Sequence, residues 1–241
     1  MVPTIYVDEQ KSLVYIGTHA GGLTVLHRNS GKMESFNQLN SQLVNENVYA
    51  ILPDKGGNLL LGTLSALVSF NPEKKSFTTI DKEKDGTPFT SQRITILFRD
   101  SHKRLWVGGE EGISVFQQEG IEIEKVPILP ESSVTKTFTN CIYEAANGII
   151  WVGTREGFYC FNEKEKKIKR YTTANGLPNN VVYGILEDTF GRLWVSTNRG
   201  ISCFNPETER FRNFTESDGL QSNQFNTSSF CRTSSGQMYF G

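Results

Sequence analysis

The chain has 241 residues, and 25 Lys and Arg against 26 Asp and Glu give it a formal net charge of -1. This length is enough to bury a large core as one domain, and the balanced charge argues against binding of nucleic acid or other polyanions through bulk charge. We expect no membrane span, because no apolar run approaches the roughly 18 residues that a bilayer requires, and the opening MVPTIYVDEQ lacks the pattern of a signal peptide.

A short apolar tetrad recurs along the chain. Its copies are VYIG (14–17), LLLG (59–62), LWVG (105–108), IWVG (150–153), LWVS (193–196) and MYFG (238–241). The spacing stays close to 45 residues, which is typical of a repeat architecture. The sequence therefore predicts repeats at approximately 3–47, 48–93, 94–138, 139–181, 182–225 and 226–241.

Each repeat reads as four short strands separated by turns. In the fifth repeat the strand-like runs are VVYGILED, LWVST, ISCFN and RFRNFT, and the short segments TFGR, NRG and PETE separate them as turns. Four antiparallel strands in about 45 residues indicate a propeller blade. We predict an all-β fold: one partial β-propeller domain over residues 1–241, with about five full four-stranded blades and a two-stranded remnant, as a fragment of a seven-bladed propeller.

Aromatic residues recur at fixed places in the repeats. Trp106, Trp151 and Trp194 occupy the second strand, where Tyr15 and Leu60 stand in the first two repeats. A second aromatic column follows ten residues later, at Phe70, Phe116, Phe161 and Phe204. Because both faces of a blade are covered by its neighbours, we expect these columns to fill the space between blades.

The reactive residue types form no recognisable catalytic or metal-binding pattern. Cys141, Cys160, Cys203 and Cys231 show no zinc-ligand spacing, and we expect them to be free, buried thiols. His19, His27 and His102 are isolated from one another in the predicted blades, and no hydrolase, zinc-protease or phosphate-loop motif is present. We therefore predict no catalytic residue, no metal site and no cofactor.

Candidate binding residues lie in two kinds of loop. In a propeller, the loops that enter each first strand and the turns between second and third strands gather at one end of the blades, and loops on a rigid scaffold commonly carry binding. The entering loops contribute Asn47, Arg93, Asn180 and Asn223, and the turns contribute His19, Glu110, Arg155, Asn198 and Arg199. Such amide and guanidinium groups can bind sugar hydroxyls or carboxylates. The alternative is that each Asn forms a turn and each Arg is a solvated surface residue.

The stretch NGLPNNVVYGILEDTFGRLWVSTNRG (175–200) resembles the two-component regulator propeller repeat, although Ser196 stands where that repeat usually has Gly. The resemblance implies the periplasmic sensor region of a hybrid histidine kinase and response regulator anchored in the inner membrane. Such regions typically hold two seven-bladed propellers followed by an immunoglobulin-like domain. The neighbouring propeller and that domain are the partners implied, and the chain would be a piece of the second propeller.

Function then follows as an expectation from this resemblance. The preferred hypothesis is a sensor module that is not itself an enzyme, binds an oligosaccharide and passes a domain rearrangement to a kinase. One alternative is a propeller lyase or hydrolase resembling streptogramin lyases, and another is a pure protein-interaction scaffold. An open sheet edge in a partial propeller would also favour a homodimer.

Overall fold

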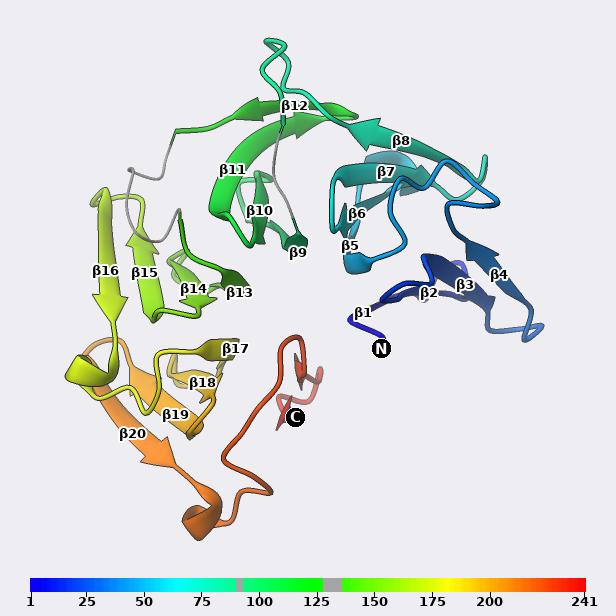
Figure 1. Ribbon diagram of the computed structural model, residues 1–241. Helices are drawn as coiled ribbons and strands as arrows, with labels where there is room; N and C mark the ends of the chain where they lie inside the picture. Colours follow the sequence, from blue (N-terminus) through cyan, green and yellow to red (C-terminus); the bar gives the residue numbers. More distant parts are fainter. Residues whose placement is uncertain (90–92, 128–135) are drawn as a thin grey trace. The chain divides into compact units, whose positions relative to one another are not determined.

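The computed structural model describes residues 1–89, 93–127 and 136–241. Within these ranges the strands form five four-stranded sheets and one two-stranded sheet (Figure 1). Every sheet is an antiparallel meander, because each strand pairs with its neighbours in sequence. The predicted all-β fold of four-stranded blades and a two-stranded remnant is confirmed. The chain divides into two compact units, Met1–Pro130 and Glu131–Gly241, while its organisation as one domain stays a prediction.

The first unit holds three sheets, whose strands have the following bounds. The first sheet is β1 (Thr4–Asp8), β2 (Leu13–Gly17), β3 (Leu23–His27) and β4 (Met33–Phe36). The second is β5 (Val48–Pro53), β6 (Leu59–Thr63), β7 (Leu67–Asn71) and β8 (Ser76–Ile80). The third is β9 (Ile94–Arg99), β10 (Leu105–Gly109), β11 (Gly112–Glu119) and β12 (Glu122–Lys125). The first strand of the second sheet, β5, lies against both β1 and β9.

The second unit holds the remaining sheets. Its first is β13 (Thr139–Glu144), β14 (Ile150–Thr154), β15 (Phe158–Asn162) and β16 (Lys167–Tyr171). Its second is β17 (Val182–Glu187), β18 (Leu193–Thr197), β19 (Gly200–Asn205) and β20 (Arg210–Phe214), and its third is the pair β21 (Phe230–Arg232) and β22 (Met238–Phe240). Three short 3-10 turns complete the described elements: η1 (Lys55–Gly57), η3 (Thr173–Asn175) and η4 (Glu216–Asp218). None of the helical segments in the described ranges is long and apolar enough to span a bilayer.

The threonine that follows most copies of the tetrad closes the turn between the second and third strands. The Oγ1 of Thr63 donates to the carbonyl oxygen of Ala66 at 2.8 Å, and Thr154 makes the same bond to Gly157 at 3.0 Å. The same carbonyl oxygens also accept the main-chain amides of these threonines, at 3.0 Å in both turns, so the hydroxyl adds a second bond that closes the turn. The repeated Gly-Thr pair is therefore a turn signal as well as the end of a strand.

The glycine that ends the tetrad makes room for the next blade. A β-carbon added to Gly62 would lie 2.7 Å from Cγ2 and 2.7 Å from the carbonyl oxygen of Ile94, the first residue of β9. A β-carbon on Gly153 would lie 2.5 Å from Cγ1 of Val182, the first residue of β17. Each of these glycines thus allows the first strand of the following sheet to approach closely.

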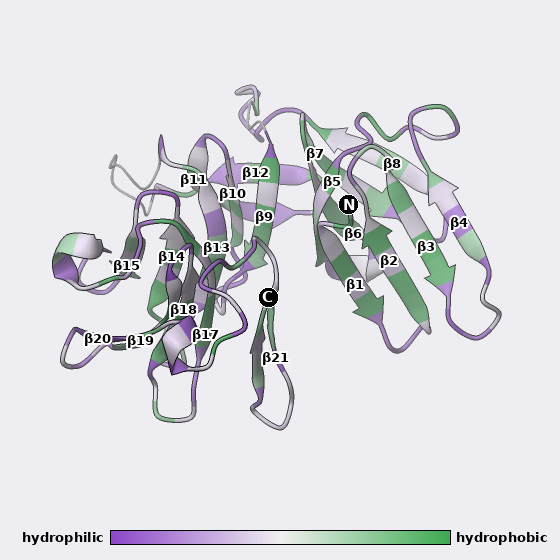
Figure 2. Cartoon of the chain, turned by 60° about the horizontal axis from the view of Figure 1, so that its bottom comes forward, coloured by the Kyte–Doolittle hydropathy of each residue, from purple (hydrophilic) through white to green (hydrophobic). Residues whose placement is uncertain are grey.

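The predicted aromatic columns pack between blades in part. Trp106 and Trp151 are almost fully buried, and the Trp151 ring lies 5.5 Å from the ring of Phe204 in the next sheet. Trp194 is half-buried and stacks on Phe214 of its own sheet, with 5.6 Å between the ring centres. In Figure 2, hydrophobic residues colour strands such as β2 and β6, whereas the outer strand β12 is largely hydrophilic.

The prediction that all four cysteines are buried is wrong for two of them. Cys141 and Cys203 are buried, and burial raises the pKa of Cys141 to about 12, so this thiol stays protonated at neutral pH. Cys160 is half-buried, and Cys231 is exposed. Cys231 lies on the three-residue strand β21, and a sheet of two such short strands covers little of its own surface.

A charged cluster that the sequence analysis did not predict supports the tryptophan of the second strand. Trp194 donates its indole N–H to Oδ2 of Asp188 at 3.0 Å, and Arg192 donates to the same oxygen at 2.7 Å. The third sheet of the first unit has the same arrangement, with Asp100 as the acceptor for Arg104 and Trp106. An aspartate that looks like a turn former therefore also anchors the indole six residues later.

This cluster predicts a pH dependence of stability. Burial opposes ionisation of Asp188, but hydrogen bonds from Trp194 and Arg192 outweigh it and lower the pKa of the carboxyl below its usual 3.8. The ionised Asp188 carboxylate therefore contributes to the free energy of unfolding, and this contribution is fully present above about pH 4. It is lost as pH falls towards the lowered pKa, because the carboxyl group binds its proton at a higher pH in the unfolded chain than in the folded one. We expect Asp188→Asn to reduce the loss of stability between pH 6 and pH 3, measured as the shift in the urea midpoint. Glu122→Gln, at an exposed position of β12, is the control, and an equal reduction in that variant would contradict the prediction.

Candidate functional site

The structure brings the entering loops and the second-to-third-strand turns together at one end of the blades within each unit. The amide of Leu64, in the β6–β7 turn, donates to the carbonyl oxygen of Asn47 at 3.2 Å, and the amide of Arg93 donates to the carbonyl oxygen of Leu64 at 2.8 Å. In the second unit Arg155 donates its amide to the carbonyl oxygen of Phe138 at 3.1 Å. Main-chain bonds therefore fix the framework of this end and leave the side chains to vary.

A β-bulge recurs at the start of the first strand in four sheets. The strand register shifts at one residue in each case, which we call the bulge position: Tyr49, Thr95, Asn140 and Tyr183. The residues beside it are repeated apolar or small residues, whereas the bulge position differs from sheet to sheet. Bulges re-aim a side chain and are frequent beside functional sites.

Three segments of the first unit meet at the bulge residue Tyr49. The His19 ring, from the β2–β3 turn, lies 6.2 Å from the Tyr49 ring in an edge-to-face arrangement. The Cζ atom of Arg93, from the loop that enters β9, lies 5.6 Å from the centre of the same ring. His19 is exposed, and Tyr49 and Arg93 are half-buried. We call these three residues the Tyr49 cluster.

Two other predicted residues border the Tyr49 cluster. Asn47 accepts a hydrogen bond from the amide of Ala20 at 3.1 Å, which ties the turn that carries His19 to the loop that enters β5. Glu110 is exposed in the β10–β11 turn. The residue before it, Gly109, lies against the backbone of Arg93, since a β-carbon there would be 2.1 Å from the Arg93 carbonyl oxygen. The first unit thus gathers His19, Asn47, Arg93 and Glu110 at one end.

In the second unit the predicted arginines are more exposed. The Arg155 guanidinium carbon lies 3.9 Å from the centre of the Phe138 ring, and Arg199 is exposed in the β18–β19 turn. Asn198 accepts a hydrogen bond at 2.9 Å from the hydroxyl of Tyr183, the bulge residue of β17. The bulge position is therefore joined to a predicted site residue here too.

Asn180 and Asn223 hold the structure of their own loops. The Oδ1 of Asn180 accepts the amide of Thr173, the first residue of η3, at 2.9 Å. The Oδ1 of Asn223 accepts the amide of Glu216, the first residue of η4, at 2.9 Å, and its Nδ2 donates to the Glu216 carboxylate at 3.1 Å. Both side chains cap a turn seven residues earlier, which agrees with the interpretation of these asparagines as turn formers.

Sequence reasoning missed Tyr49 and Tyr183. Both follow the first buried residue of a blade, a place where a strand pattern predicts simple alternation of faces. The signal in the sequence was the contrast between this variable position and its repeated neighbours.

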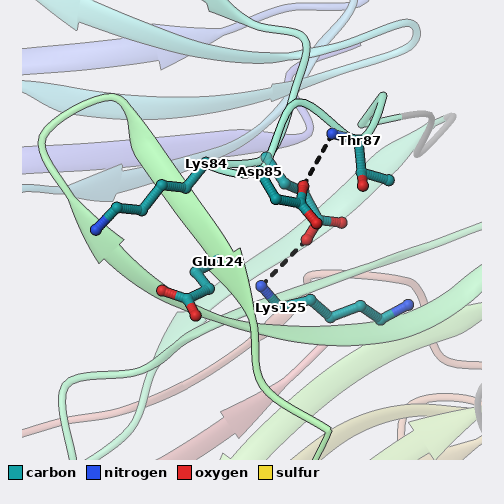
Figure 3. Close-up of a pocket in the computed structure, with 6 residues that line it drawn as sticks. Lys84, Asp85, Thr87, Glu124 and Lys125 are labelled. Carbon is teal, nitrogen blue, oxygen red and sulfur yellow. Dashed lines mark hydrogen bonds between the residues drawn. The ribbon is translucent and has the colours of Figure 1, made fainter.

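A second feature, also not predicted, is a polar groove of about 710 Å³ between the β8–β9 loop and β12. Its lining carries both charge signs: Glu83, Lys84, Asp85, Thr87, Glu124 and Lys125 (Figure 3). The loop is held in place by a bond from the Lys84 amide to the carbonyl oxygen of Ile123 at 2.8 Å and by one from the Lys125 amide to the Glu83 carboxylate at 3.2 Å. The groove therefore presents both anionic and cationic side chains.

No group of three or more His, Cys, Asp or Glu side chains is arranged to hold a metal ion in the part of the chain that the structure describes.

Comparison with known proteins identifies the repeats and the fold. The family model for the two component regulator propeller matches residues 132–156 and 176–199. Histidine kinase P4 of Formosa agariphila is 30% identical over 212 residues, which are 85% of this chain but 15% of that protein. The chain thus spans a small part of the length of this relative.

Two solved structures share the propeller architecture. The extracellular domain of BT4673 from B. thetaiotaomicron, described as a one component system, has a TM-score of 0.59 at 17% identity and is matched over 96% of this chain and 37% of that one. Virginiamycin B lyase from Staphylococcus aureus has a TM-score of 0.70 at 12% identity, over 98% of this chain and 75% of that one. At these identities the likeness shows the fold alone.

Proposed function

Since this chain carries two-component regulator propeller repeats, we propose that it is a ligand-sensing segment of a membrane-anchored histidine kinase and lies outside the cytoplasm. The observation that carries the proposal is the repeat match together with the 30% identity to Histidine kinase P4 across 85% of the chain. The segment itself has no catalytic role in this proposal. Its neighbours in the full protein would be a further propeller and an immunoglobulin-like domain.

The proposed ligand is an oligosaccharide bound at the blade ends. The proposal is supported by the structure of these ends: main-chain hydrogen bonds hold the loops in place, and the polar and aromatic side chains on them differ from blade to blade. Guanidinium, imidazole and amide groups can hydrogen-bond sugar hydroxyls and acidic groups. Binding that favours one arrangement of the sensor's domains would bias the kinase by the difference in affinity between the two arrangements.

A panel of neutral and acidic oligosaccharides, screened by thermal shift, tests this proposal. At a ligand concentration one hundred times Kd, a single site stabilises the folded chain by about 2.7 kcal/mol, so we expect Tm to rise by about 5 °C or more. The screen uses this chain and the complete extracellular region in parallel. A shift in neither protein would contradict the sugar-sensor proposal and favour the interaction scaffold.

The lyase alternative is tested on the same samples. Each saccharide that shifts Tm, and quinupristin as the streptogramin, is incubated with the chain and analysed by mass spectrometry. We expect all of them to be recovered intact. A new product would replace the sensor proposal with an enzyme.

The predicted homodimer is checked by light scattering at several protein concentrations.

A further inference from the structure

We propose that the Tyr49 cluster, His19, Tyr49 and Arg93, is a binding site for an oxyanion carried by a saccharide, either a carboxylate or a sulfate ester. The inference rests on the proposed sensing function and adds the chemical class of the ligand and the residues that select it. All three residues belong to the first unit.

The first argument is convergence. His19 comes from the turn after β2, Tyr49 from the bulge of β5 and Arg93 from the loop before β9, so three consecutive blades contribute one side chain each. The His19 and Arg93 side chains both lie against the Tyr49 ring, at 6.2 Å and 5.6 Å. A single ring thus orients two nitrogen donors from segments that are up to 74 residues apart in sequence.

The second argument is the chemistry of this group. A guanidinium presents its donors in a planar fork that matches a carboxylate or sulfate, and the cation–π contact with the Tyr49 ring, at 5.6 Å from the ring centre, helps to hold Arg93 beside the site. The imidazole and the tyrosine hydroxyl add further donors of hydrogen bonds. The ring also offers an apolar face to the sugar ring that would carry the acidic group.

The third argument is that the scaffold does not require these residues. At the position of His19 the second sheet has Leu64, at that of Arg93 the fourth sheet has Phe138, and at that of Tyr49 the third sheet has Thr95. By contrast, the residue between the Arg93 position and the Tyr49 position is buried and apolar or small in the second, third and fourth sheets, as Val48, Ile94 and Thr139. Arg93 also has a φ of 46°, in the left-handed region that favours glycine.

The test compares three probes by isothermal titration calorimetry with the whole 241-residue chain. The probes are tri-galacturonate, its carboxyl-reduced neutral trimer and a sulfated galactotriose. We expect at least one acidic probe to bind ten times or more tightly than the neutral trimer, and the stronger of the two acidic probes identifies the carboxylate or the sulfate as the recognised group. Arg93→Gln should reduce that affinity at least tenfold, and Arg93→Lys should reduce it less, because it keeps the charge but loses the planar fork of donors.

Two further variants sharpen the result. Arg28→Gln is the matched control, because Arg28 is an exposed arginine of the same unit that pairs with Glu9 beyond the end of β3. We expect its affinity to equal that of the unchanged chain. Glu110→Gln should strengthen binding of the acidic probe by removing a nearby negative charge. The Tm of each variant without ligand shows whether it is folded.

The outcomes separate this inference from the proposed function. A neutral trimer that binds as tightly as the acidic probes, or equal affinities for Arg93→Gln and Arg28→Gln, would overturn the oxyanion site while saccharide sensing stands. Failure of both acidic probes to bind would overturn the oxyanion site as well. Failure of every saccharide in the thermal-shift panel would overturn the sensing function itself.

Discussion

Asp100→Ala is expected to destabilise the first unit by about 3–5 kcal/mol, because it breaks a buried ion pair with Arg104 and removes a buried acceptor of three hydrogen bonds. The Asp100 side chain has no exposed surface and that of Arg104 is 10% exposed. Oδ2 of Asp100 accepts hydrogen bonds at 2.7 Å from both the Arg104 guanidinium and the indole N–H of the buried Trp106. Oδ1 accepts the Arg104 amide at 2.8 Å. One substitution therefore removes the acceptor of three bonds in the interior.

The second unit provides the matched comparison. Asp188 makes the same contacts, but the side chain of Arg192 is 41% exposed, so water can replace the lost partner. We expect Asp188→Ala to cost less than half as much free energy of unfolding as Asp100→Ala, measured by urea denaturation at pH 7. Equal losses would show that burial does not set the strength of this cluster. Asp100→Asn, which keeps one acceptor oxygen, should fall between the unchanged chain and Asp100→Ala.

Gly153→Ala is expected to destabilise the second unit by about 3 kcal/mol, through overpacking between two sheets. The new β-carbon would lie 2.5 Å from Sγ of Cys141 and 2.5 Å from Cγ1 of Val182. Both atoms belong to buried side chains whose surroundings leave little space to move.

A double-mutant cycle isolates this contact. Val182→Ala removes the Cγ1 atom that the new methyl group meets, at the cost of a cavity. We therefore expect Gly153→Ala with Val182→Ala to be clearly more stable than the sum of the two single changes requires, by about 1 kcal/mol or more. Additive losses would mean that the strain arises elsewhere, for example at Cys141.

The sequence predicts the blades because their determinants are local and repeated. The tetrads, the Gly-containing turns and the aromatic columns each describe one strand or hairpin, and the structure confirms the four-stranded sheets that they imply. The bond between Asp100 and Trp106 was not predicted, because an aspartate at the turn between the first and second strands already has a sufficient local role as a turn former. Only the fold brings the indole six residues later back to the same carboxylate.

The candidate site was predictable in position but only partly in composition. The two loop classes do meet within each unit, so His19 of the first sheet and Arg93 before the third sheet both lie beside Tyr49 of the second. Tyr49 escaped prediction because a bulge breaks the alternation on which strand patterns depend. Asn180 and Asn223 were included because the sequence alone does not distinguish a loop asparagine that caps a turn from one that binds a ligand. The role of the nine predicted residues in binding stays a prediction.

The close approach between a tetrad glycine and the first strand of the following sheet also bears on how the protein unfolds. Among the described residues, these contacts join one sheet to the next: Gly62 joins β6 to β9, and Gly153 joins β14 to β17. Cooperativity then passes from neighbour to neighbour, as in a one-dimensional chain of coupled units. Amide hydrogen exchange should accordingly be slowest in the sheets that have a partner on both sides, such as β5 to β8. It should be fastest in the β21–β22 hairpin, and an opening that begins there would spread one sheet at a time.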